Sequence, residues 1–371
     1  MMKFSCEKTL LQAAINVASR TVSPKSSIPA LEGLLLQAKD DLFISGYNLQ
    51  TGIRTRVSAD VTEQGEMVLN CRLFGDIIRK LPDDIVTFSA DDKLLVHLHC
   101  GDADFEILGL SAADYPELPE VEDDYCLSIE QQHLRDLIDQ TVFAVSTNES
   151  RPVHTGALFE LGGGKLTVVA VDGFRLAVRK EPTLKVEGGL FSFVVPGAAL
   201  NEVEKICGET EDTATINLGK RHILFEIGDT ELICRRLEGE FLDYKNAIPR
   251  KNPITVIADT KALIHSIDRV SVVISEKLKS PVHCIFEKDR VLLSAKTGNG
   301  EAKDICRLDG DGQELEIGFN NRYLMDALRH APADTVKIEL NTGVSPAIIV
   351  PVEGEEDFLY MVLPVRLKST D

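Results

Sequence analysis

Val171-Asp172-Gly173-Phe174-Arg175-Leu176-Ala177 contains an Asp-Gly turn between two apolar runs, as expected for a β-hairpin. Similar hairpins recur at a fixed interval. Asp172 lies 124 positions after Asn48, at the end of the predicted turn Ser45-Gly46-Tyr47-Asn48. Lys296, in the predicted turn Lys296-Thr297-Gly298, lies another 124 positions on. Because 124 is about one third of 371 residues, the repeat predicts three similar domains that fill the chain.

Each predicted domain contains two amphipathic helices. In one of them, Leu134, Leu137, Ile138, Thr141 and Val142 follow the i, i+3, i+4 spacing of a single buried stripe. The first helices are predicted at Lys8–Arg20, Glu130–Ala144 and Thr260–Val273, the second at Cys71–Leu81, Pro196–Ile206 and Gly318–Leu328, and the hairpins at Leu34–Val57, Ala157–Val178 and Cys284–Cys306. Each domain has two helices, and the rest of the domain is rich in predicted strands. This indicates an α+β fold, in which the helices cover antiparallel sheets.

Two proline-rich segments separate the repeats. Residues 115–124 (YPELPEVEDD) combine proline with acidic residues, and residues 248–253 (IPRKNP) contain two prolines. Such compositions are typical of exposed connectors. We therefore predict domains at 1–124, 125–252 and 253–371.

The composition is that of a protein with hydrophobic cores, since 44% of residues are hydrophobic. With 59 acids against 40 Lys and Arg, the net charge is −19, which argues against a surface that is basic all over but allows one basic face. No apolar run approaches the roughly 20 residues of a membrane span, and the N-terminal residues lack a signal-peptide core. The eight cysteines are scattered without a Cys-x-x-Cys pair. We expect a cytoplasmic protein with reduced cysteines and no membrane contact.

Enzyme signatures are absent: the sequence contains no Gly-x-Ser-x-Gly, His-Glu-x-x-His or Gly-x-Gly-x-x-Gly motif. The Gly162-Gly163-Gly164-Lys165 run lacks the Ser or Thr that follows the lysine of a phosphate-binding loop, and reads instead as a hairpin turn. His97 and His99 share one strand face and could hold a metal, yet no second ligand cluster has zinc-like spacing. A Cys/His nucleophile at His283-Cys284 would need an orienting group, and the sequence indicates none. A metal-dependent hydrolase at His97 and His99 is kept as a remote alternative.

Basic residues concentrate on the predicted helices, while acids crowd the loops. Arg72 and Arg79 are seven positions apart, as are Arg322 and Arg329, so each pair lies on one helix face. These faces are either ordinary solvated surfaces or a helix-lined surface that faces phosphates.

Four segments resemble one known family closely: Ile28–Leu36, Val171–Ala177, Leu237–Tyr244 and Leu363–Leu367. They are similar to the bacterial DNA sliding clamp, the beta subunit of the replicative DNA polymerase III. The resemblance covers essentially the whole chain. It implies three domains of the DNA-clamp fold, which form half of a six-domain ring made by a head-to-tail homodimer.

The resemblance also implies a function. Such a ring encircles double-stranded DNA without reading its sequence, and tethers the polymerase so that replication is processive. It implies no catalytic activity, no cofactor and no metal. The implied partners are the DNA polymerase III catalytic subunit, the clamp loader, and other polymerases and repair proteins, which bind through short hydrophobic peptide motifs. The alternative from another class is a protein-interaction scaffold of the same repeat without DNA in its hole.

The family's peptide pocket lies between the second and third domains, and the resemblance carries it onto matching positions here. They are His154, Val171, Gly173, Phe174, Arg175, Leu176, Leu242, Asn246, Ala247, Tyr323, Val344, Met361, Val362, Leu363, Pro364, Val365 and Arg366. Four positions depart from the commonest family pattern: Leu242 replaces Pro, Asn246 replaces Arg, and Leu363 and Val365 replace Met. The pocket is expected to stay apolar.

Similarity likewise suggests DNA contacts at Lys25, Arg72, Arg151, Lys277 and Lys279. Gly197-Ala198 stand where many clamps have basic residues. We expect the ring interface to join the edge strand that contains Phe105, Ile107 and Leu108 to the third domain of the partner, with Val272 and Val273 as apolar contacts.

Overall fold

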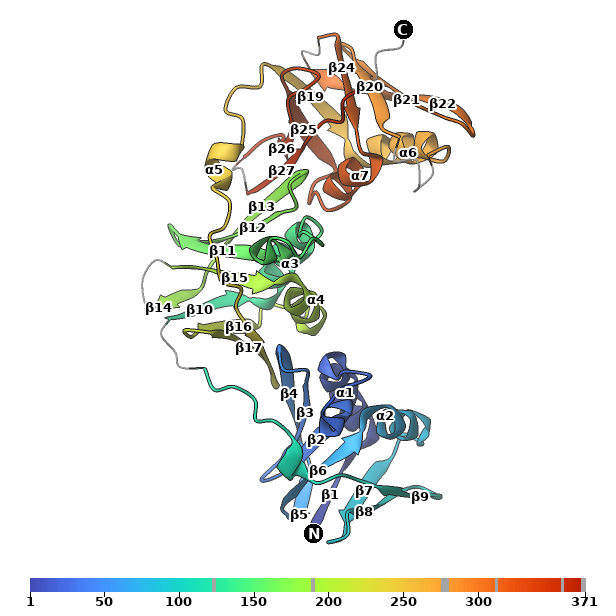
Figure 1. Cartoon of the computed structure of the whole chain (residues 1–371), viewed down its shortest axis with the longest axis vertical. Coiled ribbons are helices and arrows are strands. Elements are labelled where there is room, and N and C mark those ends of the chain that lie inside the picture. Colours follow the sequence, from blue (N-terminus) through green and yellow to red (C-terminus); the bar gives the residue numbers. More distant parts are fainter. Residues whose placement is uncertain (122–124, 188–190, 275–279, 311–312, 355–356, 368–371) are drawn as a thin grey trace. The chain divides into compact units, whose positions relative to one another are not determined.

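The computed structural model describes the chain except residues 122–124, 188–190, 275–279, 311–312, 355–356 and 368–371 (Figure 1). The chain forms two compact units. The first comprises residues 1–135, 183–189 and 201–236, and the second comprises residues 136–182, 190–200 and 237–371. No helix in the described parts of the chain is long and apolar enough to cross a membrane.

The first unit contains two antiparallel sheets. The five-stranded sheet has the order β5 (Asp60–Glu63), β1 (Met2–Glu7), β7 (Ile85–Ala90), β8 (Leu95–Cys100) and β9 (Ala103–Leu108). The nine-stranded sheet has the order β14 (Lys185–Glu187), β10 (Tyr125–Glu130), β16 (Thr213–Leu218), β17 (His222–Ile227), β18 (Thr230–Arg235), β4 (Thr51–Val57), β3 (Leu42–Tyr47), β2 (Gly33–Ala38) and β6 (Gly65–Asn70).

Two neighbouring helices, α1 (Lys8–Ala18) and α2 (Cys71–Lys80), close the core of this unit (Figure 1). Leu11 and Ile15 of α1, with Phe74 and Ile78 of α2, are buried in one cluster with residues of both sheets. The side chain of Asn70 caps α2 by accepting a hydrogen bond from the backbone N–H of Leu73. The predicted amphipathic stripes are therefore the faces that the helices bury.

The second unit repeats this plan with another pair of antiparallel sheets. Its nine-stranded sheet has the order β15 (Ser192–Pro196), β11 (Gly156–Gly162), β12 (Lys165–Val171), β13 (Arg175–Pro182), β27 (Phe358–Val362), β26 (Ala347–Pro351), β25 (Thr335–Leu340), β19 (Ile254–Asp259) and β23 (Asp309–Gly310). Its four-stranded sheet has the order β22 (Gly300–Arg307), β21 (Arg290–Thr297), β20 (Val282–Phe286) and β24 (Leu315–Phe319).

Helices α6 (Thr260–Ser271) and α7 (Asn321–Arg329) pack against each other in this unit, and the short α5 (Tyr244–Ala247) lies in the connecting segment before β19. Asp259 is the N-cap of α6, because its carboxylate accepts a hydrogen bond of 2.7 Å from the Ala262 N–H. The remaining two helices are α3 (Gln131–Val142) and α4 (Gly197–Ile206), and both extend across the division between the units.

Two sheets run across the predicted domain boundaries. Ile53 on β4 pairs with Leu232 on β18, and Ala177 on β13 pairs with Tyr360 on β27. Backbone hydrogen bonds thus join strands that we assigned to different domains, which is why the compact units differ from the three repeats. The boundaries 1–124, 125–252 and 253–371 stay a prediction.

Several predicted element ends need correction. Pro196 is the last residue of β15 rather than the start of a helix, and α4 begins at Gly197. Gly318 and Phe319 still pair with β20, so the helix predicted from Gly318 begins only at Asn321. The physical reason is the cap: the Asn320 side chain accepts hydrogen bonds from Arg322 N and Tyr323 N, which starts the helix after it.

The hairpin turns show why the 124-residue spacing is meaningful. Asn48 Oδ1 accepts hydrogen bonds from the N–H groups of Gln50 and Thr51, at 3.0 and 2.8 Å. Its counterpart Asp172 does the same for the residues two and three positions on. The first turn therefore follows Tyr47, slightly later than predicted, and the third lies at 298–299, after β21 has ended at Thr297. The glycine run 162–164 is a hairpin turn, as predicted.

Candidate functional site

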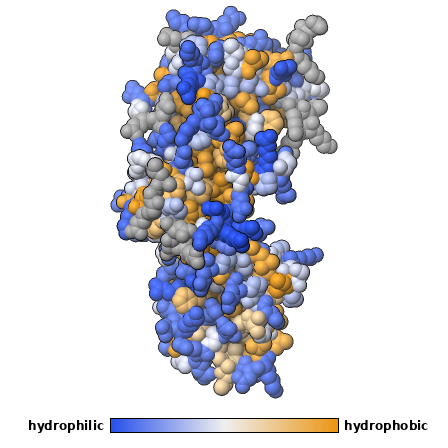
Figure 2. Space-filling model, turned by 60° about the vertical axis from the view of Figure 1, so that its left-hand side comes forward, coloured by the Kyte–Doolittle hydropathy of each residue, from blue (hydrophilic) through white to orange (hydrophobic). Residues whose placement is uncertain are grey.

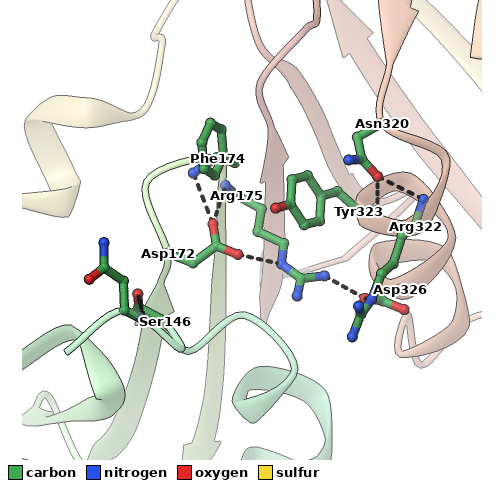
Figure 3. Close-up of polar contacts among 9 residues, drawn as sticks. Ser146, Asp172, Phe174, Arg175, Asn320, Arg322, Tyr323 and Asp326 are labelled. Atoms are coloured by element: carbon green, nitrogen blue, oxygen red, sulfur yellow. Dashed lines mark hydrogen bonds and ion pairs between the residues drawn. The ribbon is translucent and has the colours of Figure 1, made fainter. Parts of the chain in front are cut away.

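The turn between β12 and β13 presents an aromatic side chain. Asp172 Oδ1 accepts hydrogen bonds from Phe174 N at 2.9 Å and Arg175 N at 3.0 Å (Figure 3). Gly173 has φ of +90°, a conformation that glycine adopts without strain. The tight turn leaves Phe174 57% exposed, stacked on Tyr323 of α7 with 5.8 Å between ring centroids.

Arg175 connects this turn to α7. Its guanidinium donates to Asp172 Oδ2 at 3.0 Å and to Asp326 Oδ2 at 2.5 Å (Figure 3). The same group lies over the rings of Tyr323 and Phe143, at 4.6 and 5.4 Å from the centroids. Arg175 is only 7% exposed, so its charge is buried but paired. The network places Phe174 and Tyr323 side by side.

The C-terminal segment passes beside the same turn. On β27, Met361 pairs with Leu176 and Val362 with Arg175. Beyond the strand, Leu363 N donates to the carbonyl oxygen of Phe174 at 2.9 Å, and Val365 N donates to that of Gly318 at 2.8 Å. Pairing of these segments therefore positions the residues from Met361 to Val365 alongside Phe174.

An apolar floor is shared by strands from both ends of this unit. Val171, Leu176 and Met361 are buried in one cluster with Tyr244 of α5. The other buried members are Val169, Val178, Ile348 and Val350, and Leu158, Phe241, Ile248 and Leu359 pack against them. On the side where α5 lies, Figure 2 shows hydrophobic residues at the surface, bordered by hydrophilic ones.

A second group of predicted residues lines a hollow of about 490 Å³. Its walls are residues 151–154, which include most of the short helical turn Pro152–Thr155, and residues 238–243. His154 meets the Phe241 ring edge-on at 5.4 Å. Partial burial, and then the nearby Arg151 guanidinium, hold the pKa of His154 below its ordinary value. Leu242 also lines this hollow and is 39% exposed.

The structure brings most of the predicted pocket residues together. Val171, Leu176 and Met361 are floor residues, Phe174 and Tyr323 form an aromatic pair, and the residues from Val362 to Val365 continue from β27. Others are exposed side chains outside this floor: Asn246 and Ala247 on α5, Val344 in the loop before β26, and Arg366. Arg175 is placed beneath the aromatic pair as a positioning residue rather than a surface contact.

The predicted DNA contacts are distributed over the chain. Lys25, Arg72 and Arg151 are exposed and form no ion pair among the residues that the structure describes. Lys277 and Lys279 lie outside the described residues. Other helix cations are paired with acids: Arg79 with Asp76, Arg20 with Glu202, and Arg269 with Asp304. Pairing of this kind lowers the positive charge of the helix faces.

The predicted interface residues lie at sheet edges or helix ends. β9 is the last strand of its sheet, and within the described part of the chain only β8 pairs with it. Phe105 and Leu108 on β9 are 37% and 71% exposed, and Ile107 is half-buried. Val272, at the end of α6, is 83% exposed, and Val273 is half-buried.

Known protein families match this chain from end to end. Models of the N-terminal, central and C-terminal domains of the DNA polymerase III beta subunit match residues 2–119, 128–243 and 245–366. The Beta sliding clamp of Halalkalibacterium halodurans is 31% identical over 379 residues, which cover 98% of this chain and 100% of that protein. The chain belongs to the DNA polymerase III beta subunit family.

Solved sliding clamps have the same fold. The sliding clamp of Bacillus subtilis is 28% identical, with a TM-score of 0.93 over 99% of this chain and 100% of its own. A sliding clamp of Pseudomonas aeruginosa bound to griselimycin is 27% identical, with a TM-score of 0.93 and the same coverage. The predicted α+β sliding-clamp fold is confirmed, and the chain is a processivity clamp of DNA replication.

Several residues that the structure places beside the predicted pocket positions were missed by sequence reasoning. Tyr244 and Ile348 contribute to the floor, and Phe143 and Asp326 hold Arg175. The continuous apolar run of β26 was a signal for Ile348. No local pattern indicated Phe143 or Asp326, because Asp326 lies 151 positions from Arg175.

The two histidines weighed as metal ligands have acidic partners on β9. His97 Nδ1 lies 3.2 Å from Glu106 Oε1, and His99 Nδ1 lies 2.8 Å from Asp104 Oδ1. These are cross-strand pairs between β8 and β9, with all four side chains more than half exposed. Within the described ranges, no group of three or more potential metal ligands gathers here or elsewhere.

Proposed function

We propose that two copies of this chain close head to tail into a ring around duplex DNA, which carries the replicative polymerase and other proteins along it. The full-length match to sliding clamps carries this proposal. The chain acts without catalysis, cofactor or metal, in the cytoplasm. Its proposed partners are the DNA polymerase III catalytic subunit, the clamp loader, and other polymerases and repair proteins.

The charge distribution supports sliding rather than gripping. A closed ring is held on DNA by topology, so it needs only weak contacts with phosphates. Lys25, Arg72 and Arg151 are exposed cations of the kind that such contacts require, on a chain whose net charge is −19. Because many helix cations are already paired with acids, the attraction stays mild and the ring can move.

Exposed sheet edges support ring closure. β9 ends one sheet, and β22 ends the four-stranded sheet of the other unit. Both carry exposed apolar side chains, such as Leu108 on β9 and Ile305 on β22, and Ile305 is 57% exposed. An unpaired edge with apolar side chains favours pairing with another chain, and a head-to-tail contact that closes makes a ring. Val272 adds an exposed apolar residue to the same proposed contact.

The apolar floor beside Phe174 is the proposed docking place for partner peptides. Burial of about 300 Å² of apolar surface is worth roughly 7 kcal/mol before ordering costs, at about 25 cal/mol/Å². Affinity is therefore expected to be about micromolar or weaker. At that strength, partners can exchange on one clamp.

Retention on DNA of different topology tests the function. The clamp is loaded onto circular and linear duplexes of equal length by a clamp loader, and the bound fraction is measured after a wash at high salt. Enclosure predicts retention on the circle and loss from the open ends of the linear duplex. Equal loss from both would favour the alternative, a protein-interaction scaffold without DNA in its hole.

A further inference from the structure

Three arginines, here named the arginine cluster, gather at one end of the nine-stranded sheet of the first unit. Arg221 lies in the turn between β16 and β17, Arg235 is the last residue of β18, and Arg236 follows it. The backbone joins them, because Arg236 N donates a hydrogen bond to the carbonyl oxygen of Arg221 at 3.0 Å. Arg235 is also the cross-strand partner of His222 on β17. Three cations thus lie close together in a chain whose net charge is −19.

The charges of the arginine cluster are not neutralised by the residues that the structure describes. None of the three side chains forms an ion pair or a hydrogen bond with them. The acids of the adjoining strands are engaged elsewhere: Glu231 binds Arg54 at 2.6 Å, and Glu226 accepts a hydrogen bond from Asn217 at 2.8 Å. Glu238, which follows β18, is exposed and not paired with the cluster. The positive charge is therefore available to a ligand.

His222 is affected by the positive charge around it. Partial burial, and then the charges of Arg235 and Arg221, hold the pKa of His222 below its ordinary value. Arg221 and Arg235 are exposed, and Arg236 is half-buried. A ligand that approaches from solvent can therefore reach two guanidinium groups without displacing a partner of either.

The arginine cluster lies at a position equivalent to part of the proposed peptide pocket. Arg235 N donates to the carbonyl oxygen of Gln50, in the turn between β3 and β4, at 3.1 Å. Leu363 N makes the same bond to Phe174, in the turn between β12 and β13, at 2.9 Å. The two turns are equivalent, because Gln50 and Phe174 are 124 positions apart. An arginine therefore stands in the first repeat where a leucine stands in the second.

The apolar space beside this turn is filled by the chain itself. Tyr115 is 7% exposed and belongs to one buried cluster with Ala30, Leu31 and Tyr47, the residue at the end of β3. Its hydroxyl donates to the carbonyl oxygen of Ser45 at 3.4 Å. A charged ligand therefore fits this end of the sheet better than a hydrophobic peptide does.

The neighbourhood of the cluster favours phosphate as the ligand. A guanidinium group presents a planar fork of N–H donors, which matches the oxygens of a phosphate or a carboxylate. Lys25, a predicted DNA contact, lies in the loop after the short helical turn Ser19–Thr21. Thr21 Oγ1 donates to the carbonyl oxygen of Gly46 at 2.9 Å, near the same end of β3. A DNA backbone that reaches Lys25 can therefore continue past the β3–β4 turn to the arginines.

We propose that the arginine cluster binds phosphates of the DNA that the clamp carries. The inference rests on the proposed function and adds a contact site at the strand ends to those on the helices and at Lys25. Contacts with phosphates carry no sequence preference, which suits a protein that moves along DNA.

The salt dependence of DNA binding tests the cluster on the full chain. The probe is a short fluorescein-labelled duplex, and its association constant is measured by anisotropy over a range of sodium chloride concentrations. The double variant Arg221→Gln and Arg235→Gln removes two exposed charges and keeps long polar side chains. Since each phosphate contact contributes about 0.9 to the slope of log K against log salt, the slope should become shallower by about 2, with at least about a tenfold loss of affinity at low salt.

The matched control removes two cations from hairpin turns elsewhere. Lys93 lies between β7 and β8, and Lys288 between β20 and β21, and both are exposed. The double variant Lys93→Gln and Lys288→Gln changes the net charge by the same amount and should keep the slope of the parent. A melting temperature close to that of the parent shows that each double variant is folded.

Three results would overturn the inference. The first is an unchanged slope in the arginine variant, and the second is an equal loss of slope in the lysine control. The third is a glutamate peptide of the same charge that binds the parent as tightly as the duplex does and loses as much affinity in the arginine variant.

Retention on circular DNA separates this inference from the proposed ring. After a wash at high salt, the parent and the arginine variant should be retained equally on the circle, because enclosure does not depend on these contacts. Loss of the parent from the circle would contradict the ring. A parent that is retained, together with an unchanged slope in the arginine variant, would contradict the arginine cluster alone.

Discussion

Arg175 shows at the residue scale how one buried charge can shape the surface that we propose for peptide docking. Its ion pairs with Asp172 and Asp326 link the β12–β13 turn to α7, and its guanidinium supports the Tyr323 ring. The resemblance placed Arg175 in the pocket. In the structure, its guanidinium lies against the Tyr323 ring and is bonded to Asp172 and Asp326. Arg175 therefore positions the turn that carries Phe174 against α7.

Loss of Arg175 should therefore destabilise the second unit. Arg175→Ala leaves two partly buried carboxylates without their partner, which typically costs about 3 kcal/mol of unfolding free energy. The matched control is Arg322→Ala, because Arg322 is 79% exposed and lies 3.9 Å from the same Asp326. Its cost should be less than about 1 kcal/mol. Urea unfolding followed by circular dichroism measures both, and equal losses would contradict the role of Arg175.

His154 should add a pH dependence to stability. Because the pKa of His154 is lowered in the folded chain, the unfolded chain takes up this proton at higher pH. The stabilisation is fully present above the ordinary pKa of about 6.5 and is lost as pH falls below it toward the depressed value. In His154→Gln this contribution is removed, so the fall in melting temperature between about pH 7.5 and about pH 5.5 should be smaller.

Scanning calorimetry at the two pH values measures this difference. The parent and His154→Gln differ only at this residue, so the difference between their pH dependences is due to His154 and not to the other seven histidines. The exposed His265 offers a matched substitution, His265→Gln. An identical pH dependence in the parent and in His154→Gln would show that the residue is not perturbed by its surroundings.

At the scale of elements, caps decided where the predicted helices begin. Asn70, Asp259 and Asn320 each accept a backbone hydrogen bond at a helix start. At α6 the capping residue is Asp259. At α7, the helix was predicted to start at Gly318, but Gly318 and Phe319 both belong to β24.

The cap of α7 gives a testable consequence. Asn320→Ala removes the acceptor of the Arg322 and Tyr323 N–H groups and should cost about 1 kcal/mol of unfolding free energy. Asn320→Asp keeps an acceptor and should cost much less. Because α7 carries Tyr323, the alanine variant should also weaken binding of a hydrophobic hexapeptide with two leucines and one phenylalanine. Chemical unfolding and anisotropy measure the two effects, and an unchanged stability would refute the cap.

At the scale of the whole molecule, the proposed ring depends on edges that one chain leaves unpaired. Val272→Asp and Leu108→Asp place charges on two exposed apolar positions of the proposed interface. A buried, unpaired carboxylate opposes association. We expect each variant to shift the sedimentation coefficient from that of a dimer toward that of a single chain at micromolar concentration.

Leu184→Asp is the matched control, since Leu184 is 55% exposed between β13 and β14, outside the proposed interface. It should leave the dimer intact in analytical ultracentrifugation. A dimer that survives both interface substitutions would place the ring contact elsewhere.

Features that depend on neighbouring residues could be predicted from the chain alone. The amphipathic helices, the Asp172 turn and the 124-residue repeat come from local spacing, and a turn residue or a buried stripe has the same physical requirement wherever it occurs. The family resemblance then supplied most of the pocket residues, among them Phe174, Leu176 and Met361. The structure places these three beside one another through the pairing of β13 with β27.

Other features depend on contacts between distant residues and had no signal in the sequence. Asp326 meets Arg175, Tyr244 closes the floor over Val171 and Met361, and β4 pairs with β18 across a predicted boundary. Which acids neutralise which helix cations follows from the same long-range packing. Such contacts join segments about 70 to 180 positions apart, so no periodicity or motif could show them, and only the folded chain brings their charges and surfaces together.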